Sequence, residues 1–282
     1  LVFPSARSGN LDIWLLDLAD PENPDQLTMA PQPDVEPSWS PDGARILFST
    51  LQGTETGMND LWVMNADGSE AQPLLQWPES YEWGAAWSPD GEKIAFTSTR
   101  DFDYEIYIMD ANGEGDPINL TDNEALDSYP DWSADGRWLV FVSDRSGDWE
   151  IWKMDVEACL AARLADEGGA DACEATQLTD SPGDDFFPRW SPDGSQIVFT
   201  SRRNANRNIY IMDADGDNLV QVTNSRDHDS NPIWALDGQA IIFSSKRNAD
   251  WGIYIIKPDG AEERLLTDAP GEDRFGDWWS GE

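Results

Sequence analysis

Histidine and long apolar runs are scarce or missing in this sequence. One histidine, His228, stands among 282 residues, which excludes metal sites built on histidine pairs and most histidine-based proton relays. No apolar run approaches the roughly 18 residues of a membrane-spanning helix, so we expect no membrane insertion. A Gly-x-Ser-x-Gly motif is also missing, which removes the nucleophile of an α/β-hydrolase.

Basic residues are few as well. Lys and Arg total 18 against 55 Asp and Glu, for a net charge of −37. Such a chain repels phosphate backbones and anionic membranes, so nucleic acid is excluded as a partner. The acidity suits a high-salt habitat or a protein that collects cations. The 15 Trp, 10 Phe and 6 Tyr indicate an ordered chain with a large core.

A short repeated motif divides the chain into six units. A tryptophan followed by a Pro-Asp-Gly type of turn recurs at spacings of 48, 45, 58, 44 and 45 residues, and the step from the last copy round to the first is 42. Its tryptophans are Trp39, Trp87, Trp132, Trp190, Trp234 and Trp279. We expect one domain over 1–282, in which the first blade is completed by residues 1–31 and blades start near residues 34, 82, 127, 185, 229 and 274.

Each unit is predicted to form four short antiparallel strands. A β-rich segment follows each turn, then a variable loop, an Ile-Tyr or Ile-Trp strand, a second turn and a fourth strand. No segment has helical periodicity over ten residues. This pattern predicts an all-β, six-bladed β-propeller. Leu1–Phe3 matches a second strand and Asp277–Ser280 a first strand, so the C-terminal segment should close the ring as an innermost strand.

The repeat resembles that of TolB-type propellers. Residues 188–223 carry the pattern almost throughout, from Pro188 and the Trp190–Gly194 turn to Ile209-Tyr210, Met212–Gly216 and Thr223. The resemblance covers all six units and implies the same fold. The family includes periplasmic scaffolds, gates on peptidases and propellers attached to larger secreted proteins, so fold alone decides little about function.

The fourth unit carries one large insertion, residues 157–176, bracketed by the only two cysteines. Cys159 and Cys173 fit no zinc motif. A disulfide would close this loop and contribute about 3 kcal/mol. It predicts an oxidising compartment, and hence an extracytoplasmic protein, periplasmic or secreted. Two free thiols are the alternative.

An acidic residue lies five positions before the motif tryptophan in five of six units. In the sixth unit Arg274 takes this position, next to Asp273. Pseudo-symmetry should bring these acids round one channel mouth, where close carboxylates need a cation, and an all-oxygen set suits calcium. The alternative is that each acid caps its own loop. The predicted calcium ligands are Asp34, Glu82, Asp127, Asp185 and Asp229.

Arginines after the second strand are predicted to make structural ion pairs. In three units an acid follows the arginine by five residues, which suggests pairs that would fix the intervening loop. These pairs are Arg7 with Asp12, Arg100 with Glu105, and Arg145 with Glu150.

Aromatic residues outside the repeat pattern gather on the same predicted face. Exposed aromatic rings beside carboxylates suit a basic protein or peptide segment, or a glycan. The predicted ligand-binding residues are Trp77, Trp83, Tyr104, Tyr129, Trp149, Phe186, Trp251 and Phe275.

These observations favour a monomeric, non-catalytic binding module with no catalytic residues. Two alternatives stay open. One is a carbohydrate-active enzyme, a glycosidase that uses two carboxylates, since acids are plentiful and tryptophan stacks on sugars. The other is a passive propeller domain of a larger secreted protein.

Overall fold

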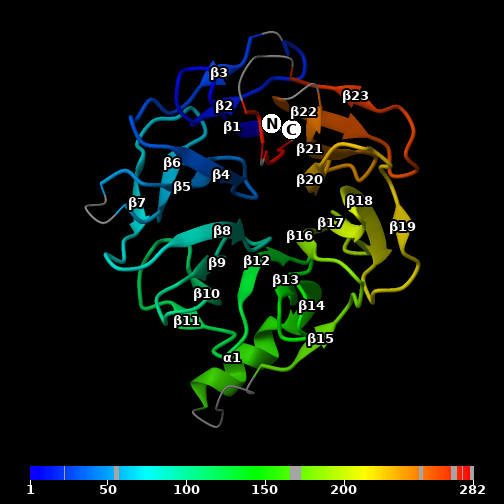
Figure 1. Ribbon diagram of the computed structural model, residues 1–282. Coiled ribbons are helices and arrows are strands. Elements are labelled where there is room, and N and C mark those ends of the chain that lie inside the picture. Colours follow the sequence, from blue (N-terminus) through cyan, green and yellow to red (C-terminus); the bar gives the residue numbers. More distant parts are fainter. Residues whose placement is uncertain are drawn as a thin grey trace.

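The computed structural model describes residues 1–21, 23–53, 57–165, 173–247, 250–267, 272–274 and 276–279. Six antiparallel sheets stand round a central axis like blades, as predicted (Figure 1). Five blades have four strands, and in each of these the first strand in sequence lies innermost. None of the described helices is long and apolar enough to cross a membrane.

The strands follow the repeat closely. Blade 1 has β1 (Val2–Ser5), β2 (Asp12–Leu15) and β3 (Asp25–Gln26); blade 2 has β4 (Asp34–Trp39), β5 (Arg45–Thr50), β6 (Asp60–Asn65) and β7 (Gln72–Leu75); blade 3 has β8 (Glu82–Trp87), β9 (Lys93–Ser98), β10 (Glu105–Asp110) and β11 (Ile118–Asn119). Blade 4 has β12 (Asp127–Trp132), β13 (Trp138–Ser143), β14 (Glu150–Asp155) and β15 (Ala175–Gln177); blade 5 has β16 (Asp185–Trp190), β17 (Gln196–Asn204), β18 (Asn206–Asp213) and β19 (Val220–Gln221); blade 6 has β20 (Asp229–Trp234), β21 (Ile241–Arg247), β22 (Asp250–Ile256) and β23 (Arg264–Leu265).

The two ends of the chain meet in blade 1, as the sequence predicts. Val2 and Asp277 form an antiparallel bridge in which each backbone N–H donates to the other's carbonyl at 2.8 Å. The C-terminal segment thus completes the three-stranded sheet, so the edge of β1 is covered.

The hydrophobic core lies between neighbouring blades. The motif tryptophans of β4, β8, β12, β16 and β20 are 7–9% exposed. The indole N–H of Trp87 donates to the Ser38 carbonyl of the preceding blade, and that of Trp132 donates to the Ala86 carbonyl, both at 3.3 Å. Each bond ties one blade to the next and satisfies a buried polar group.

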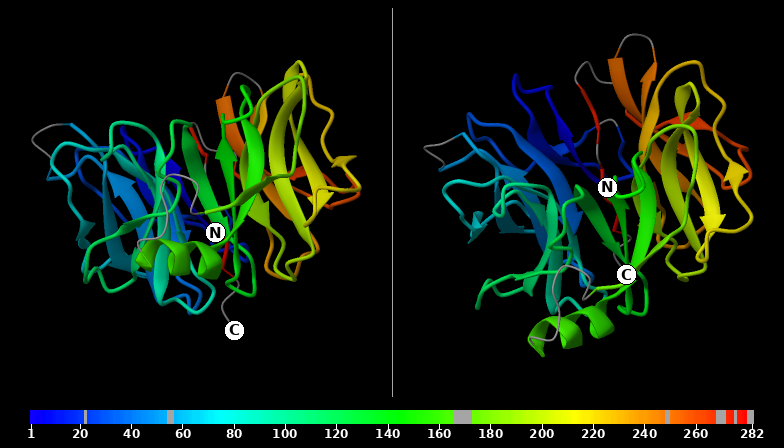
Figure 2. Two further views of the ribbon diagram at one scale, coloured as in Figure 1. Left: turned by 90° about the horizontal axis from the view of Figure 1, so that it is seen from below. Right: turned by 60° about the horizontal axis from the view of Figure 1, so that its bottom comes forward.

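The insertion in blade 4 contains a helix that the sequence analysis did not expect. Helix α1 (Val156–Leu164) begins at Asp155, whose carboxylate accepts from the Ala158 N–H at 3.0 Å. It lies at the periphery of the disc (Figures 1 and 2). Cys159 and Cys173 form the predicted disulfide, with Cα atoms 4.5 Å apart. Residues 166–172 of the insertion lie outside the described part.

Candidate functional site at the channel face

A β-bulge in each of five innermost strands shapes the central channel. The pairing register shifts after the second residue of β4, β8, β12, β16 and β20. The third residue then has a positive φ of 53–61°, a conformation that is costly for residues other than glycine. These third residues are Glu36, Gly84, Tyr129, Phe187 and Asn231.

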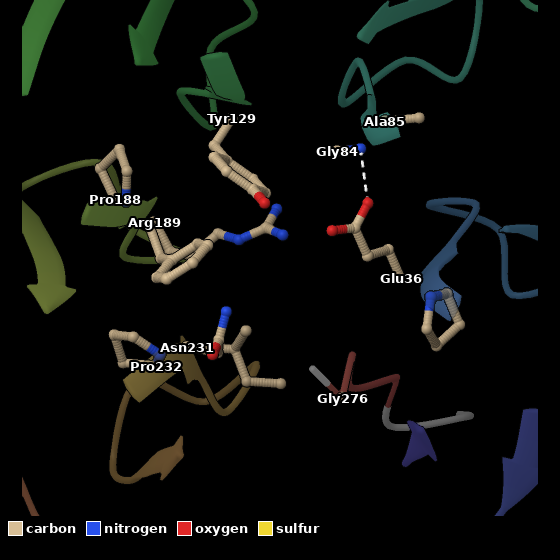
Figure 3. Close-up of a pocket in the computed structure, with 12 residues that line it drawn as sticks. Glu36, Gly84, Ala85, Tyr129, Pro188, Arg189, Asn231, Pro232 and Gly276 are labelled. Atoms are coloured by element: carbon tan, nitrogen blue, oxygen red, sulfur yellow. Dashed lines mark hydrogen bonds between the residues drawn. The ribbon is translucent and has the colours of Figure 1, made fainter. Parts of the chain in front are cut away.

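Charged side chains meet inside this channel round a small cavity of about 30 Å³. Figure 3 shows Arg189, Tyr129 and Glu36 pointing toward one another. Arg189 Nη1 donates to Asp131 Oδ1 at 3.0 Å, and Asp131 Oδ2 accepts from the Trp190 N–H at 2.8 Å. The network therefore joins side chains of blades 2, 4 and 5.

Burial shapes the electrostatics of the channel. It raises the pKa of the Glu36 carboxyl, while the hydrogen bond from the Gly84 N–H at 2.8 Å and the charge of Arg189 lower it. Burial likewise raises the pKa of Asp131 against the opposing effect of Arg189. Burial disfavours the charge on Arg189, but the carboxylates of Asp131, Asp277 and Glu36 hold its pKa above the ordinary value. Arg189 thus neutralises part of the acid in the channel.

A larger cavity of about 500 Å³ opens beside the channel mouth. Glu36 and Tyr129 line this cavity as well as the small one, so the two are neighbours. Aromatic rings make up most of its wall. The residues that line it are Glu36, Asn59, Tyr81, Trp83, Thr99, Tyr104, Ser128, Tyr129, Trp149 and Phe186.

The chain's family follows from comparison with known proteins. A family model described as the TolB beta propeller domain matches residues 79–177 and 170–273, more than half of the chain. The chain belongs to the TolB β-propeller family.

Solved structures agree on the fold. TolB from Acinetobacter baumannii matches with a TM-score of 0.80 at 20% identity; the match covers 97% of this chain and 64% of that one. A protein assigned as TolB from Agrobacterium tumefaciens gives 0.75 at 22% identity, covering 96% and 91%. The tricorn protease gives 0.70 at 18% identity, covering 100% of this chain and 27% of the protease. A propeller of this fold is thus also part of a protease.

Within this TolB-family propeller, the structure brings five of the eight predicted aromatic residues together. Trp83, Tyr104, Tyr129, Trp149 and Phe186 all line the 500 Å³ cavity. These residues come from three consecutive blades: Trp83, Tyr129 and Phe186 lie on the innermost strands of blades 3, 4 and 5, and Tyr104 and Trp149 lie in the loops before the third strands of blades 3 and 4.

Two other predicted aromatics lie elsewhere. Trp77 packs between Phe96 and Tyr107, with ring centroids 6.1 and 5.5 Å away, so it belongs to the core. Trp251 lies outside the cavity, with Arg274 stacked over its ring at 4.6 Å. Phe275 lies outside the described residues.

The five acids predicted to bind calcium are the first residues of the innermost strands, and each is fully buried. They lie within the blade walls, and none of them lines the two cavities just described. In blades 4, 5 and 6 an arginine 18 residues later pairs with the acid, at 2.8, 2.8 and 3.4 Å. The pairs are Arg145 with Asp127, Arg203 with Asp185, and Arg247 with Asp229.

The ion pairs predicted over five residues are wrong. Arg7 pairs with Asp273 at 2.9 Å, Arg145 pairs with Asp127, and Arg100 stacks on Trp77 at 4.3 Å. The acids at the start of the third strand have other partners. Glu105, for example, accepts from the Thr121 hydroxyl and from the Asn123 N–H. In blade 4 the register places Ser143 between Glu150 of the third strand and Asp127 of the innermost strand, and Arg145 pairs with the acid of the innermost strand.

Two blades lack the arginine pair and bury carboxyl groups side by side instead. In blade 2, Gln52 stands where the other blades have the arginine. Burial raises the pKa of Asp34, and the negative charge of the nearby Asp12 raises it further. In blade 3, burial raises the pKa of Glu82 to about 7, and the neighbouring Asp60 adds to the effect. Across the described ranges, no three Asp, Glu, His or Cys side chains are grouped so that they could hold one metal ion.

Sequence reasoning missed Glu36, Tyr81 and Arg189. The sequence does contain a signal for the bulges next to Glu36 and Arg189. In four innermost strands a proline follows the bulge position, at Pro37, Pro130, Pro188 and Pro232. Proline inside a sheet is confined to edges and bulges, so it marks where the alternation of side chains breaks.

Proposed function

We propose that this propeller is a non-catalytic, extracytoplasmic binding module that holds a protein segment of basic character at its channel face. The observation that carries the proposal is the 500 Å³ cavity, in which five of the ten lining side chains are Tyr or Trp and a sixth is Phe186. Aromatic residues concentrate binding energy at protein interfaces because they bury much area at little cost in conformational entropy.

The rim of the cavity supports a contact with a macromolecule. Tyr81 is 43% exposed and Tyr104 is 39% exposed. Between two lining residues, Thr99 and Tyr104, the side chain of Phe102 is fully exposed, on a backbone with a φ of 80°. Large apolar side chains exposed beside a cavity are typical of docking surfaces.

Charge favours a basic partner over an acidic or neutral one. The net charge of −37 attracts cations over long distances at low salt, and Glu36 adds a carboxylate to the cavity wall. The disulfide and the membership in the TolB family support a place outside the cytoplasm, periplasmic or secreted. We expect the protein to be a monomer in solution.

A peptide-display selection tests the proposal. Random 12-residue peptides would be selected on the wild-type protein, with Trp149→Leu as the counter-selection target and Trp251→Leu as a matched control outside the cavity. We expect selected peptides to be enriched in Lys and Arg, and to lose at least tenfold in affinity on Trp149→Leu only. Selected peptides that bind Trp149→Leu as well as they bind the wild type would refute the channel-face site.

Catalysis is the alternative. Of the five ring acids, Asp127, Asp185 and Asp229 are neutralised by arginine, an arrangement that suits a structural role. A glycan panel incubated with the protein separates the two: turnover that disappears in Glu36→Gln would establish a glycosidase. Binding of a glycan without turnover would support a binding site at the channel face, with a glycan rather than a basic peptide as its ligand.

The calcium site stays a prediction. Its remaining candidates are Asp34 and Glu82, because their blades lack the arginine pair. Thermal unfolding at fixed ionic strength, with calcium, magnesium or a chelator, is the test. A site filled to 100 times its dissociation constant would stabilise the fold by about 2.7 kcal/mol, and Asp34→Asn should abolish that gain. Equal shifts of the unfolding temperature with calcium and with sodium chloride of the same ionic strength would show that the protein has no calcium site.

A further inference from the structure

Aromatic rings of the cavity contact one another in pairs, one pair within blade 3 and one between blades 4 and 5. Trp83 of β8 and Tyr104, just before β10, meet edge to face with centroids 5.0 Å apart. Trp149, just before β14, and Phe186 of β16 meet with centroids 5.8 Å apart. Tyr129 lines the same cavity from β12, between these two elements in sequence. Five of the six aromatic rings that line the cavity thus pack against another ring.

Outside the cavity, aromatic rings of this protein bind arginine side chains on their faces. In blades 1, 4, 5 and 6 an arginine at the end of the second strand, or just after it, stacks over the aromatic residue of the third strand. The distances from guanidinium carbon to ring centroid are 5.0, 4.9, 4.8 and 4.4 Å for Arg7 on Trp14, Arg145 on Trp152, Arg203 on Tyr210 and Arg247 on Tyr254. Such contacts are favourable because the π face of a ring carries negative charge.

The cavity rings differ in this respect. Throughout the described ranges, no arginine or lysine side chain stacks on Trp83, Tyr104 or Trp149. Among the described residues that line the cavity, Glu36 supplies the one carboxylate. Its Oε2 is held by the Gly84 N–H at 2.8 Å, which fixes the side chain of Glu36 at the wall. Ring faces and one oriented carboxylate are the parts of a site for an organic cation.

We propose that this cavity is a cage for a single cationic side chain, the ammonium of a lysine or the guanidinium of an arginine in the bound segment, with Glu36 as its counter-charge. The inference rests on the proposed function and names the chemistry that the site recognises. Glu36 lines both cavities: its carboxylate faces Arg189 in the channel (Figure 3) and also stands in the wall of the aromatic cavity, where it offers the ligand a charge beside the rings.

The test compares four peptides that differ in one side chain. The probes are acetyl-Gly-Gly-Xaa-Gly-Gly-amide with arginine, lysine, norleucine or glutamate at Xaa, titrated at constant ionic strength while tryptophan fluorescence is followed. Norleucine matches the apolar stem of lysine without its charge, so it separates a cation cage from an apolar pocket. We expect the arginine and lysine peptides to bind at least tenfold more tightly than the norleucine and glutamate peptides.

Variants show whether the cage or the overall charge is responsible. Trp149→Leu keeps an apolar side chain but removes a ring, and Glu36→Gln removes the charge; each should weaken the arginine peptide at least fivefold. Trp251→Leu, outside the cavity, should leave binding unchanged. Circular dichroism checks that each variant is folded, and Trp83→Leu replaces Trp149→Leu if that variant is not.

Three results would overturn the cage. These are equal binding of the norleucine and arginine peptides, equal losses in Trp251→Leu and Trp149→Leu, and no binding of either cationic peptide. In each case the proposed function is decided separately, because display-selected basic peptides that depend on Trp149 would preserve it.

Discussion

Arg145 donates from Nη2 to both carboxylate oxygens of Asp127, at 2.8 and 2.9 Å, and so joins the end of the second strand of blade 4 to the start of its innermost strand. Asp127 is fully buried, while 23% of the Arg145 side chain is exposed. The residues that sequence symmetry presents as an acidic ring therefore fasten the innermost strands to their own blades.

Removing this arginine should destabilise the propeller. Loss of one partner from a buried ion pair costs about 3–5 kcal/mol, and we expect about 2–3 kcal/mol for Arg145→Ala because the arginine is partly exposed. Urea unfolding measures the loss, and Asp127→Asn in the same chain should recover part of it. Lys93→Ala is the control: its pair with Asp110 is exposed on both sides, so its loss should cost under about 1 kcal/mol. Equal effects of the two alanine variants would contradict a structural role for the acid ring.

The Glu82 carboxyl makes stability fall with rising pH. Burial raises its pKa from 4.5 to about 7 in the folded protein. The folded state then binds the proton more tightly than the unfolded chain, so the free energy of unfolding decreases between pH 4.5 and 7. Glu82→Gln imitates the protonated form, because its amide accepts from Ser80 and Ser98 and can donate to Asp60.

We expect Glu82→Gln to stabilise the protein by about 2 kcal/mol at pH 8 and to have little effect at pH 4.5. Chemical unfolding at both pH values measures the difference. The exposed Glu92→Gln serves as control and should change stability little at either pH. A Glu82→Gln variant that is less stable than the wild type at pH 8 would show that the charged carboxylate is needed.

Alanine substitutions at two equivalent turn glycines distinguish the contribution of ring closure to stability from the cost of backbone strain. Gly43 and Gly238 occupy the same turn with φ of 65° and 66°. A Cβ on Gly43 would lie 2.0 Å from the Trp279 ring, whereas a Cβ on Gly238 meets nothing within 4 Å. Gly238→Ala should cost about 1 kcal/mol through strain alone.

Gly43→Ala should cost about 2 kcal/mol more than Gly238→Ala, because Trp279 must leave its place between blades 1 and 2. Thermal unfolding gives the two losses, and hydrogen exchange at the Val2 and Asp277 amides shows whether the closing bridge opens. Similar losses in the two variants would mean that Trp279 contributes little to closure.

The disulfide should stabilise the insertion. In the chain-entropy description, closing a loop of about 15 residues contributes about 3 kcal/mol. A reductant or the double change of Cys159→Ser and Cys173→Ser should therefore lower the melting temperature, and mass spectrometry after alkylation counts the thiols. An unchanged melting temperature after complete reduction would show that the insertion unfolds separately from the blades.

The sequence predicts the blades well because the repeat is local. The motif tryptophans, the turns after them and the strand periodicity lie within about 45 residues, and pseudo-symmetry supplies the ring. Even the closure at Val2 and Asp277 follows from two incomplete units that match each other.

The site is harder to predict because it depends on one break in strand alternation. Pseudo-symmetry places Asp127 and its counterparts in one ring, which is why Asp127 was predicted to lie at the channel mouth, but it does not show which way their side chains face. The bulge at Tyr129 moves the channel side to the third position, so Asp127 turns into the blade and Tyr129 lines the cavities. The Arg145–Asp127 contact was missed for a related reason, since it spans 18 residues and two strands.

The most direct test of binding at the channel face is an NMR titration that follows the indole N–H signals of the 15 tryptophans. The ligand is a display-selected basic peptide, and single Trp→Phe changes assign the signals. The account predicts that Trp83 and Trp149 shift first and saturate together, while Trp77 and Trp251 stay in place. Shifts confined to tryptophans outside the cavity, with Trp83 and Trp149 unmoved at saturation, would contradict it.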